Sequence, residues 1–265
     1  MRQQRTLQQV IGCAGVGLHS GARVAVTLRP SAEDTGIRFR RVDRPGSPSI
    51  LAHPRNADTV DGVTCLRNAE GGCVRSVDQL LAAIAACEID NILVELSGPE
   101  MPVMDGTPRP FLLLLECAGI LEQSRPAAWL EVARPVEVVS RASAVRLEPG
   151  DGLEVAIEQS GLATFALCAP AGGVRSALFG EREPRRSPLD PEARERARAV
   201  ALAALGGLAL VPAGISARYV ERAGGPELRC ALMRELLRDP ANYRLRGPVA
   251  GASIRPELRA AARMA

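Results

Sequence analysis

The sequence contains little histidine: only His19 and His53 occur among its 265 residues. A catalytic metal site that needs several histidines in one cleft, for the metal and for proton transfer, therefore has too few of them here. Aromatic residues are also scarce, at 3% of the chain. Their scarcity indicates a core of Ala, Leu and Val and argues against nucleic-acid binding by base stacking.

The chain also lacks a strong excess of one charge and a paired-cysteine motif. Its formal net charge is +3, and no basic cluster is large enough to predict a groove for a polyanion. The seven cysteines are odd in number and form no CxxC motif. We expect them to be reduced and mostly buried, as in a cytoplasmic protein.

No segment predicts a membrane anchor. The N-terminus is basic but lacks the apolar segment and cleavage site of a signal peptide. Residues 199–217 carry no charge, yet Gly206, Gly207, Pro212 and Gly214 interrupt them. This pattern predicts a buried helix followed by a strand rather than a transmembrane segment.

The first half predicts strands followed by a helix, a strand and a second helix. Ser76 is the expected N-cap of a helix over Val77–Cys87, with Asp78 in its first turn. The second helix, over Pro110–Ala118, should end at Gly119. The predicted strands are Val24–Leu28, Gly36–Arg40, Thr59–Leu66 and Ile92–Leu96.

The second half repeats this order of elements. Arg125-Pro126 is the predicted boundary between a domain over 1–125 and a domain over 126–265, which has a divergent insert around 181–215. Together the halves predict an α+β fold of two similar layered sheet-and-helix sandwiches that face each other across a cleft. The elements predicted here are strands at Val136–Val139, Ala144–Leu147, Leu153–Ile157, Ala163–Leu167 and Tyr243–Leu245, and helices at Pro226–Arg238 and Arg255–Arg263.

Five separated motifs resemble those of UDP-3-O-acyl-N-acetylglucosamine deacetylases, zinc enzymes of lipid A synthesis. The resemblance is dense over residues 1–122, moderate to about Gly180, poor over 181–225 and only positional from Pro226. It implies two α+β sandwiches with the active site between them. The motifs are Gln4-Arg5-Thr6-Leu7, Gly15-Val16-Gly17-Leu18-His19-Ser20-Gly21, Ile89-Asp90-Asn91-Ile92, Pro102-Val103-Met104-Asp105-Gly106-Thr107 and Pro110-Phe111.

The resemblance also implies which residues should carry the chemistry of the first half. The family's first helix begins with Ser/Thr-Val-Glu-His-Leu, in which Glu is the general base and His binds zinc. The corresponding residues here include Asp78, which keeps a carboxylate, and Gln79, whose amide is a poor zinc ligand. His19 would lie in the substrate cleft, although a structural turn histidine is the alternative. We expect His53 in a surface loop.

In the second half the family residues are replaced as well. Cys230 stands where the family has a metal-binding histidine, and Arg234 stands where it has an aspartate ligand one turn later. Pro248 takes the place of the general-acid histidine. Leu178 takes the place of the threonine that polarises the substrate carbonyl. Phe179 keeps the aromatic residue that lines the family's substrate site, although core packing would also explain it.

These replacements suggest a metal-free and catalytically inactive member of the family, with a binding or regulatory role and a UDP-sugar or an acyl chain as ligand. We expect no bound zinc and no nucleic-acid partner. Arg234 could occupy roughly the metal's place and pair with Asp78, unless it points to solvent. One alternative is an active deacetylase with a rearranged site that uses Cys230 and Asp78. Another is a structural or interaction protein whose cleft is filled.

Overall fold

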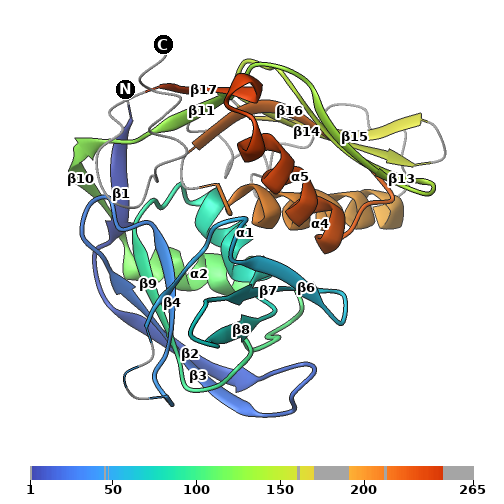
Figure 1. The fold of residues 1–265 in the computed structure, drawn as a ribbon. Coiled ribbons are helices and arrows are strands. Elements are labelled where there is room, and N and C mark those ends of the chain that lie inside the picture. The colour runs from blue at the N-terminus through green and yellow to red at the C-terminus, as the bar shows by residue number, and fades with distance from the viewer. Residues whose placement is uncertain are drawn as a thin grey trace.

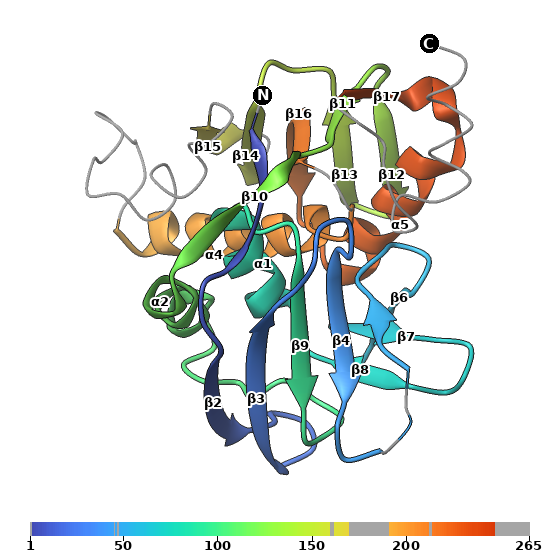
Figure 2. The ribbon, with the colours of Figure 1, turned by 90° about the vertical axis from the view of Figure 1, so that its left-hand side faces the viewer.

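The computed structural model describes residues 2–44, 46, 48–159, 162–169, 191–211 and 214–246; for 159, 162–169 and 191–198 it describes only the course of the backbone. The fold is α+β, as the sequence predicts, with two large sheets and the helices between them (Figures 1 and 2). These helices are α1 (Asp78–Ala86), α2 (Arg109–Ala118), α4 (Pro191–Leu208) and α5 (Pro226–Arg238). No helix in the described ranges is long and apolar enough to cross a membrane.

The large sheet of the first half is mixed. Its strand order is β2-β3-β9-β4-β5, and only β4 and β9 run parallel. The alternation of buried and exposed residues along β3 directs Val24, Val26 and Leu28 into the core. The strands are β2 (Ile11–Val16), β3 (Arg23–Pro30), β4 (Ile37–Arg41), β5 (Ile50–Leu51) and β9 (Ile92–Leu96).

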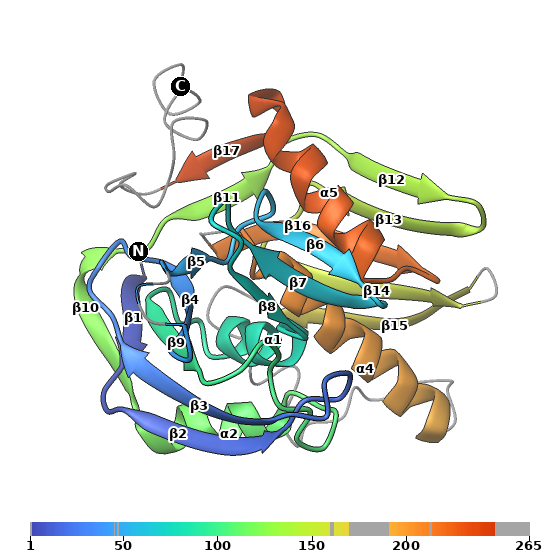
Figure 3. The same cartoon turned by 60° about the horizontal axis from the view of Figure 1, so that its bottom comes forward.

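A small three-stranded sheet lies beside α1 and α5 (Figure 3). It consists of β6 (Ala57–Val60), β7 (Val63–Arg67) and β8 (Cys73–Arg75). The prediction of a single strand over Thr59–Leu66 is therefore wrong. Asp61 and Gly62, with φ of 51° and 77°, form a tight hairpin turn, because an Asp-Gly pair accepts the positive φ that such turns require.

The predicted cap of α1 is also wrong. Val77 is the N-cap residue and makes no side-chain cap hydrogen bond. Ser76 has φ of 59°, and its hydroxyl donates to Glu100 Oε1 at 2.9 Å instead of to the helix. The predicted end of α2 is confirmed, because Gly119 closes that helix with φ of 72°.

The second half forms the other large sheet, in the order β12-β13-β16-β11-β17, with β14 also paired to β16 and β15 paired to β14. The predicted strands are confirmed. Of the uncharged run over 199–217, residues 199–208 form the end of α4 and residues 214–217 form the start of β16. The predicted helix over 255–263 lies outside the described residues. The strands are β11 (Trp129–Val132), β12 (Val136–Ser140), β13 (Ser143–Glu148), β14 (Leu153–Gln159), β15 (Leu162–Ala169), β16 (Gly214–Arg222) and β17 (Tyr243–Arg246).

Two further strands connect the halves at the edge of the molecule. β1 (Gln3–Leu7) pairs antiparallel with β10 (Ile120–Pro126), so the chain passes along this ribbon just before it enters the second half. Arg2 also ties this ribbon to the turn before β9, because its guanidinium donates to both oxygens of Asp90 at 2.7 Å. The ribbon therefore fixes the N-terminal strand against the last strand of the first half.

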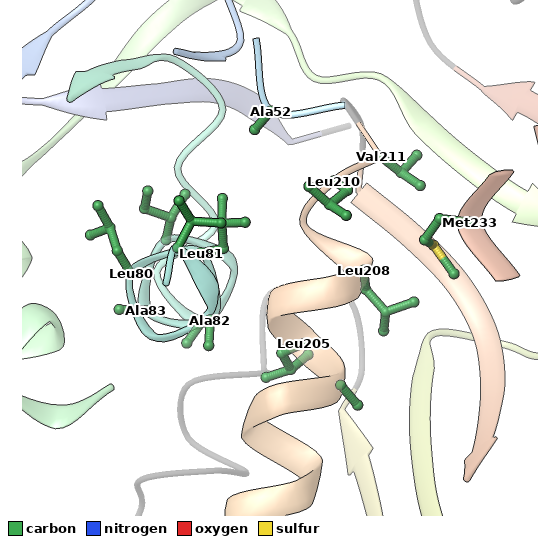
Figure 4. Packing of buried hydrophobic residues seen from close by; sticks show 14 of the residues in the cluster. Ala52, Leu80, Leu81, Ala82, Ala83, Leu205, Leu208, Leu210, Val211 and Met233 are labelled. Atoms are coloured by element: carbon green, nitrogen blue, oxygen red, sulfur yellow. The ribbon is translucent and has the colours of Figure 1, made fainter. Parts of the chain in front are cut away.

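One hydrophobic cluster runs through both halves. Figure 4 shows its central part, where Ala82 of α1 and Leu205 of α4 lie on facing sides of the two helices. The helices approach closely at Gly206, where an added Cβ would lie 2.7 Å from the carbonyl oxygen of Asp78. The packing of α4 on α1 therefore brings a helix of the second half against the start of α1.

Candidate functional site

The predicted site at the start of α1 centres on the carboxylate of Asp78. Asp78 is the first residue of the helix, where free backbone N–H groups and the helix dipole favour a negative charge. Its Oδ2 accepts a hydrogen bond from the backbone N–H of Thr64 at 3.1 Å, and its Oδ1 accepts one from the Thr64 hydroxyl at 2.5 Å. β7 therefore holds this carboxylate in one orientation.

Helix α5 brings the thiol of Cys230 into the electrostatic reach of Asp78. The Cys230 residue is 1% exposed. Burial raises the pKa of its thiol, and the charge of Asp78 raises it further, whereas Arg234 lowers it. Because the net shift is upward, the sulfur stays protonated near neutral pH in the metal-free protein and is a poor nucleophile.

The hypothesis of an Asp78–Arg234 ion pair is wrong. The Nε atom of Arg234 donates to the carbonyl oxygen of Pro54 at 3.2 Å, and its terminal nitrogen donates to that of Ala57 at 2.7 Å. The Arg234 residue is exposed, as the alternative expected, but its guanidinium is bound to these two carbonyl oxygens rather than free in solvent. The turn before β6 offers two carbonyl oxygens to the guanidinium, while Thr64 already satisfies Asp78. Arg234 therefore ties α5 to this turn.

Gln79 faces a different space from Cys230. It lines a small cavity of about 90 Å³ together with Asp78, at the place where α1, α4 and the loop before α2 meet. Ligand pockets for drug-sized molecules are several times larger, at about 300–1,000 Å³. The other residues around the cavity are Ala82, Gly106, Thr107, Pro108, Arg109, Ala199, Leu202 and Ala203.

His19 lies in an exposed turn, and a carboxylate holds its backbone. Its N–H donates to both oxygens of Glu100 at 3.1 and 3.2 Å, and the N–H of Ser20 donates to Oε2 at 2.8 Å. Glu100 also accepts from Ser76, directly before the α1 cap, so one carboxylate joins the His19 turn to the start of α1. No sequence pattern pointed to Glu100, because its partners are mostly backbone groups.

The expectation that His53 lies on the surface is wrong, since the residue is 5% exposed. Its Nδ1 accepts a hydrogen bond from the backbone N–H of Arg55 at 3.3 Å. Burial and, to a smaller extent, the charge of Arg55 lower the pKa of His53 to about 4. This histidine is therefore neutral at pH 7 and forms part of the turn that accepts Arg234.

A buried polar cluster, which sequence reasoning did not find, fixes the residue before Cys230. Arg229 donates to both oxygens of Glu221 at 3.0 and 2.6 Å, and the Tyr219 hydroxyl donates to Glu221 Oε2 at 2.5 Å. Glu221 is 1% exposed, and its charge is compensated within the cluster. The cluster therefore joins β16 to α5 and orients the helix that presents Cys230 and Arg234.

The structure thus brings Asp78, Cys230 and Arg234 to one region, although they belong to different halves. Gln79 lies at its side, and His19 is connected to it only through Glu100 and Ser76. The remaining predicted positions, Leu178, Phe179 and Pro248, lie outside the described residues.

The described side chains of this region do not fit a zinc site. Zinc hydrolysis needs about three protein ligands and an open position for water. Gln79 offers an amide, Cys230 a buried protonated thiol, and Arg234 a permanent cation already bound to backbone carbonyls. Throughout the described ranges, no three His, Cys, Asp or Glu side chains come together as a metal would require.

Comparison with known proteins connects this arrangement to a family. The profile of the UDP-3-O-acyl N-acetylglycosamine deacetylase family matches residues 4–164. The deacetylase of Xanthomonas axonopodis pv. citri is 41% identical over 161 residues, and that of Methylococcus capsulatus is 44% identical over 158 residues. Each alignment covers 58% of this chain and 51% of the relative. The chain thus spans about half the length of the curated relatives it matches.

The match includes Asp78 and Gln79, whereas Cys230 and Arg234 lie beyond it. The tertiary structure, not the alignment, shows that Cys230 lies within electrostatic reach of both Asp78 and Arg234. The matched segment covers more than half of the 265 residues. The chain belongs to the UDP-3-O-acyl N-acetylglycosamine deacetylase family, whose named relatives are deacetylases.

Proposed function

We propose that this protein is a metal-free, catalytically inactive member of the family that binds a ligand at the site around Asp78. The observation that carries the proposal is the position of Arg234. Its guanidinium is bound to the carbonyl oxygens of Pro54 and Ala57, on the helix face where the family resemblance places a carboxylate ligand. A permanent cation at this position would repel Zn²⁺ and cannot ligate it.

The state of Cys230 supports the same proposal. A thiol must lose its proton to bind zinc, and burial together with the Asp78 charge disfavours that loss. Asp78 itself is engaged by Thr64 on both oxygens. An active deacetylase with a rearranged site that used Cys230 would have to deprotonate this buried thiol.

We propose a UDP-sugar or an acyl chain as the ligand, because the named relatives are UDP-3-O-acyl-N-acetylglucosamine deacetylases. The second candidate is a structural or interaction protein whose cleft is filled. The small cavity beside Gln79 and the close approach of Gly206 to Asp78 favour this candidate, because they leave little room among the described residues at the start of α1.

Metal content and turnover test the central proposal. The full chain is purified from zinc-supplemented cells, and its zinc is measured by elemental analysis. Deacetylation of UDP-3-O-acyl-N-acetylglucosamine is then assayed beside the Xanthomonas enzyme as a positive control. We expect far less than one zinc per chain and no turnover. One zinc per chain, with turnover that disappears in Asp78→Ala but persists in Asp58→Ala, would overturn the proposal. Asp58 is an exposed aspartate of β6 and is therefore a matched control.

Thermal unfolding separates the ligand-binding proposal from the structural one. A ligand that binds the native state alone raises the melting temperature with its concentration. UDP-N-acetylglucosamine and its 3-O-acyl derivative are titrated against the full chain. We expect a concentration-dependent rise that Asp78→Ala reduces more than Asp58→Ala does. If neither compound changes the melting temperature, the structural role is the correct one.

A further inference from the structure

Two cysteines of the small sheet lie with their sulfur atoms in direct contact. The Sγ atoms of Cys65 and Cys73 are 2.8 Å apart. This separation exceeds the length of a disulfide, about 2.05 Å, by less than about 1 Å. Both residues are free cysteines. A small movement of either side chain would therefore bring the sulfurs to bonding distance.

The strand register explains this contact. β7 and β8 are antiparallel, with Cys65 opposite Arg75 and Arg67 opposite Cys73. Residues two apart in a strand share a face, so the two cysteines are diagonal neighbours on one face of the pair. The register therefore places both cysteines on one face of the strand pair, and their side chains turn toward each other across it.

We propose that Cys65 and Cys73 are a redox-active thiol pair that closes to an intramolecular disulfide when a low-molecular-weight disulfide, such as oxidised glutathione, acts as the oxidant. This inference is independent of the ligand proposed above. It uses neither Asp78 nor Cys230, and it adds a modification site to the small sheet.

The different burial of the two cysteines sets the order of the steps. Cys65 is fully buried, and its burial, with a smaller contribution from Cys73, raises the pKa of its thiol to about 12. Cys73 is half-buried and lies on β8, at the edge of the sheet. The thiolate of Cys73 attacks the glutathione disulfide, forms a mixed disulfide and releases one glutathione thiolate.

The second step uses the buried sulfur. Cys65 loses its proton and attacks the Cys73 sulfur, which breaks the bond to glutathione and releases the second glutathione thiolate. Both released thiolates take up the protons that the two cysteines lose. The protein pair is oxidised by two electrons, and one oxidised glutathione is reduced to two molecules of glutathione.

Cys65 and Cys73 lie between two residues, Thr64 and Arg75, whose hydrogen bonds hold parts of the candidate site in place. Thr64, which holds Asp78, precedes Cys65 directly. Arg75 at the end of β8 makes backbone hydrogen bonds with Pro99 and Met101, on either side of Glu100. A disulfide would join β7, which carries Thr64, to β8, which ends at Arg75. Oxidation should therefore stabilise the small sheet.

Peptide mapping tests the proposal on the folded full chain. The protein is incubated with oxidised glutathione, quenched in acid, alkylated and digested with trypsin without reduction. Trypsin cuts after Arg55, Arg67 and Arg75, so the two cysteines fall on separate peptides, 56–67 and 68–75. We expect these peptides to be linked, with a mass lower by two hydrogen atoms than their sum, and to separate on reduction. Exposed Cys117 on α2 should carry glutathione and serves as an internal control.

Two variants make the test specific. In Cys65→Ser, Cys73 should retain glutathione as a mixed disulfide, because the second sulfur is absent. In Cys73→Ser, which changes only the half-buried residue and should fold, Cys65 should stay reduced and the oxidant should no longer raise the melting temperature. The proposal is overturned if wild-type protein shows both cysteines alkylated singly, or Cys73 blocked by glutathione with no link to Cys65.

Discussion

At the scale of single residues, Glu100 is a fully buried carboxylate, and hydrogen bonds stabilise its charge. Backbone N–H groups of His19 and Ser20 and the hydroxyl of Ser76 all donate to it. Burial raises the pKa of Glu100, but the bonds from Ser20, His19 and Ser76 outweigh burial and hold the pKa at about 2 instead of 4.5. Folding therefore favours the ionised form.

This shift predicts a pH dependence of stability. Because the pKa is lower in the folded state, Glu100 contributes its full stabilisation above pH 4.5 and loses it as the pH falls toward 2. The shift corresponds to about 3 kcal/mol. We expect Glu100→Gln to be less stable than wild type by about this amount at pH 7. The difference should shrink between pH 4.5 and 2 in urea unfolding. A difference that stays constant with pH would contradict the prediction.

Arg234 shows that the type of a residue does not determine which partners it binds. Its place in the sequence identifies a cation where the family resemblance implies a ligand. Its partners, the carbonyl oxygens of Pro54 and Ala57, lie far away in the sequence and are backbone atoms. A pattern of side-chain types carries no information about such partners, so the expected pairing with Asp78 was wrong.

The packing of α4 on α1 is the contact that matters most at the scale of elements. Gly206 allows it, because a Cβ at this position would lie only 2.7 Å from the carbonyl oxygen of Asp78, too close for any other residue. At the neighbouring Gly207, an added Cβ would lie 3.1 Å from the Cβ of Arg229. The first contact is with backbone that cannot move freely, and the second is with a side chain.

Alanine at these two glycines should therefore have different effects. Alanine normally stabilises a helix interior by about 1 kcal/mol relative to glycine. We expect Gly206→Ala to destabilise the protein by about 1–3 kcal/mol through overpacking, and Gly207→Ala to be close to neutral. Chemical denaturation followed by circular dichroism measures both. Equal stability of the two variants would mean that α4 does not pack on α1 in this way.

The helices and strands show which sequence signals are reliable. α5 begins and ends at the predicted residues, and α2 ends at Gly119 as expected, because proline and glycine limit these helices directly. The β6–β7 hairpin was missed because a continuous run of strand-forming residues obscured the Asp61-Gly62 turn. Ser76 does not cap α1, because its hydroxyl donates a hydrogen bond to Glu100, which is distant in the sequence.

At the scale of the whole molecule, the two halves share one hydrophobic core. The cluster extends from Leu7 in β1 to Tyr243 in β17 and includes residues of both large sheets. Separating the halves would expose the facing sides of α1 and α4 to water. The free energy of burial therefore couples the two halves.

This coupling predicts one cooperative unfolding transition. Trp129, the single tryptophan, lies on β11 and reports on the second half, whereas far-UV circular dichroism reports on the whole chain. We expect their urea midpoints to coincide. A fluorescence transition at a clearly different urea concentration would show that the halves unfold independently.

The sequence alone determined the α+β class, most of the elements and the family, because periodicity, helix-ending residues and local motifs are encoded by neighbours along the chain. It also determined that histidine is scarce. Only the tertiary structure decided where the side chains at the site direct their bonds. Asp78 bonds to Thr64, Arg234 to two backbone carbonyls, and Glu100 to the His19 turn. Each of these partners comes from a distant segment, and close packing, rather than local preference, brings it within reach.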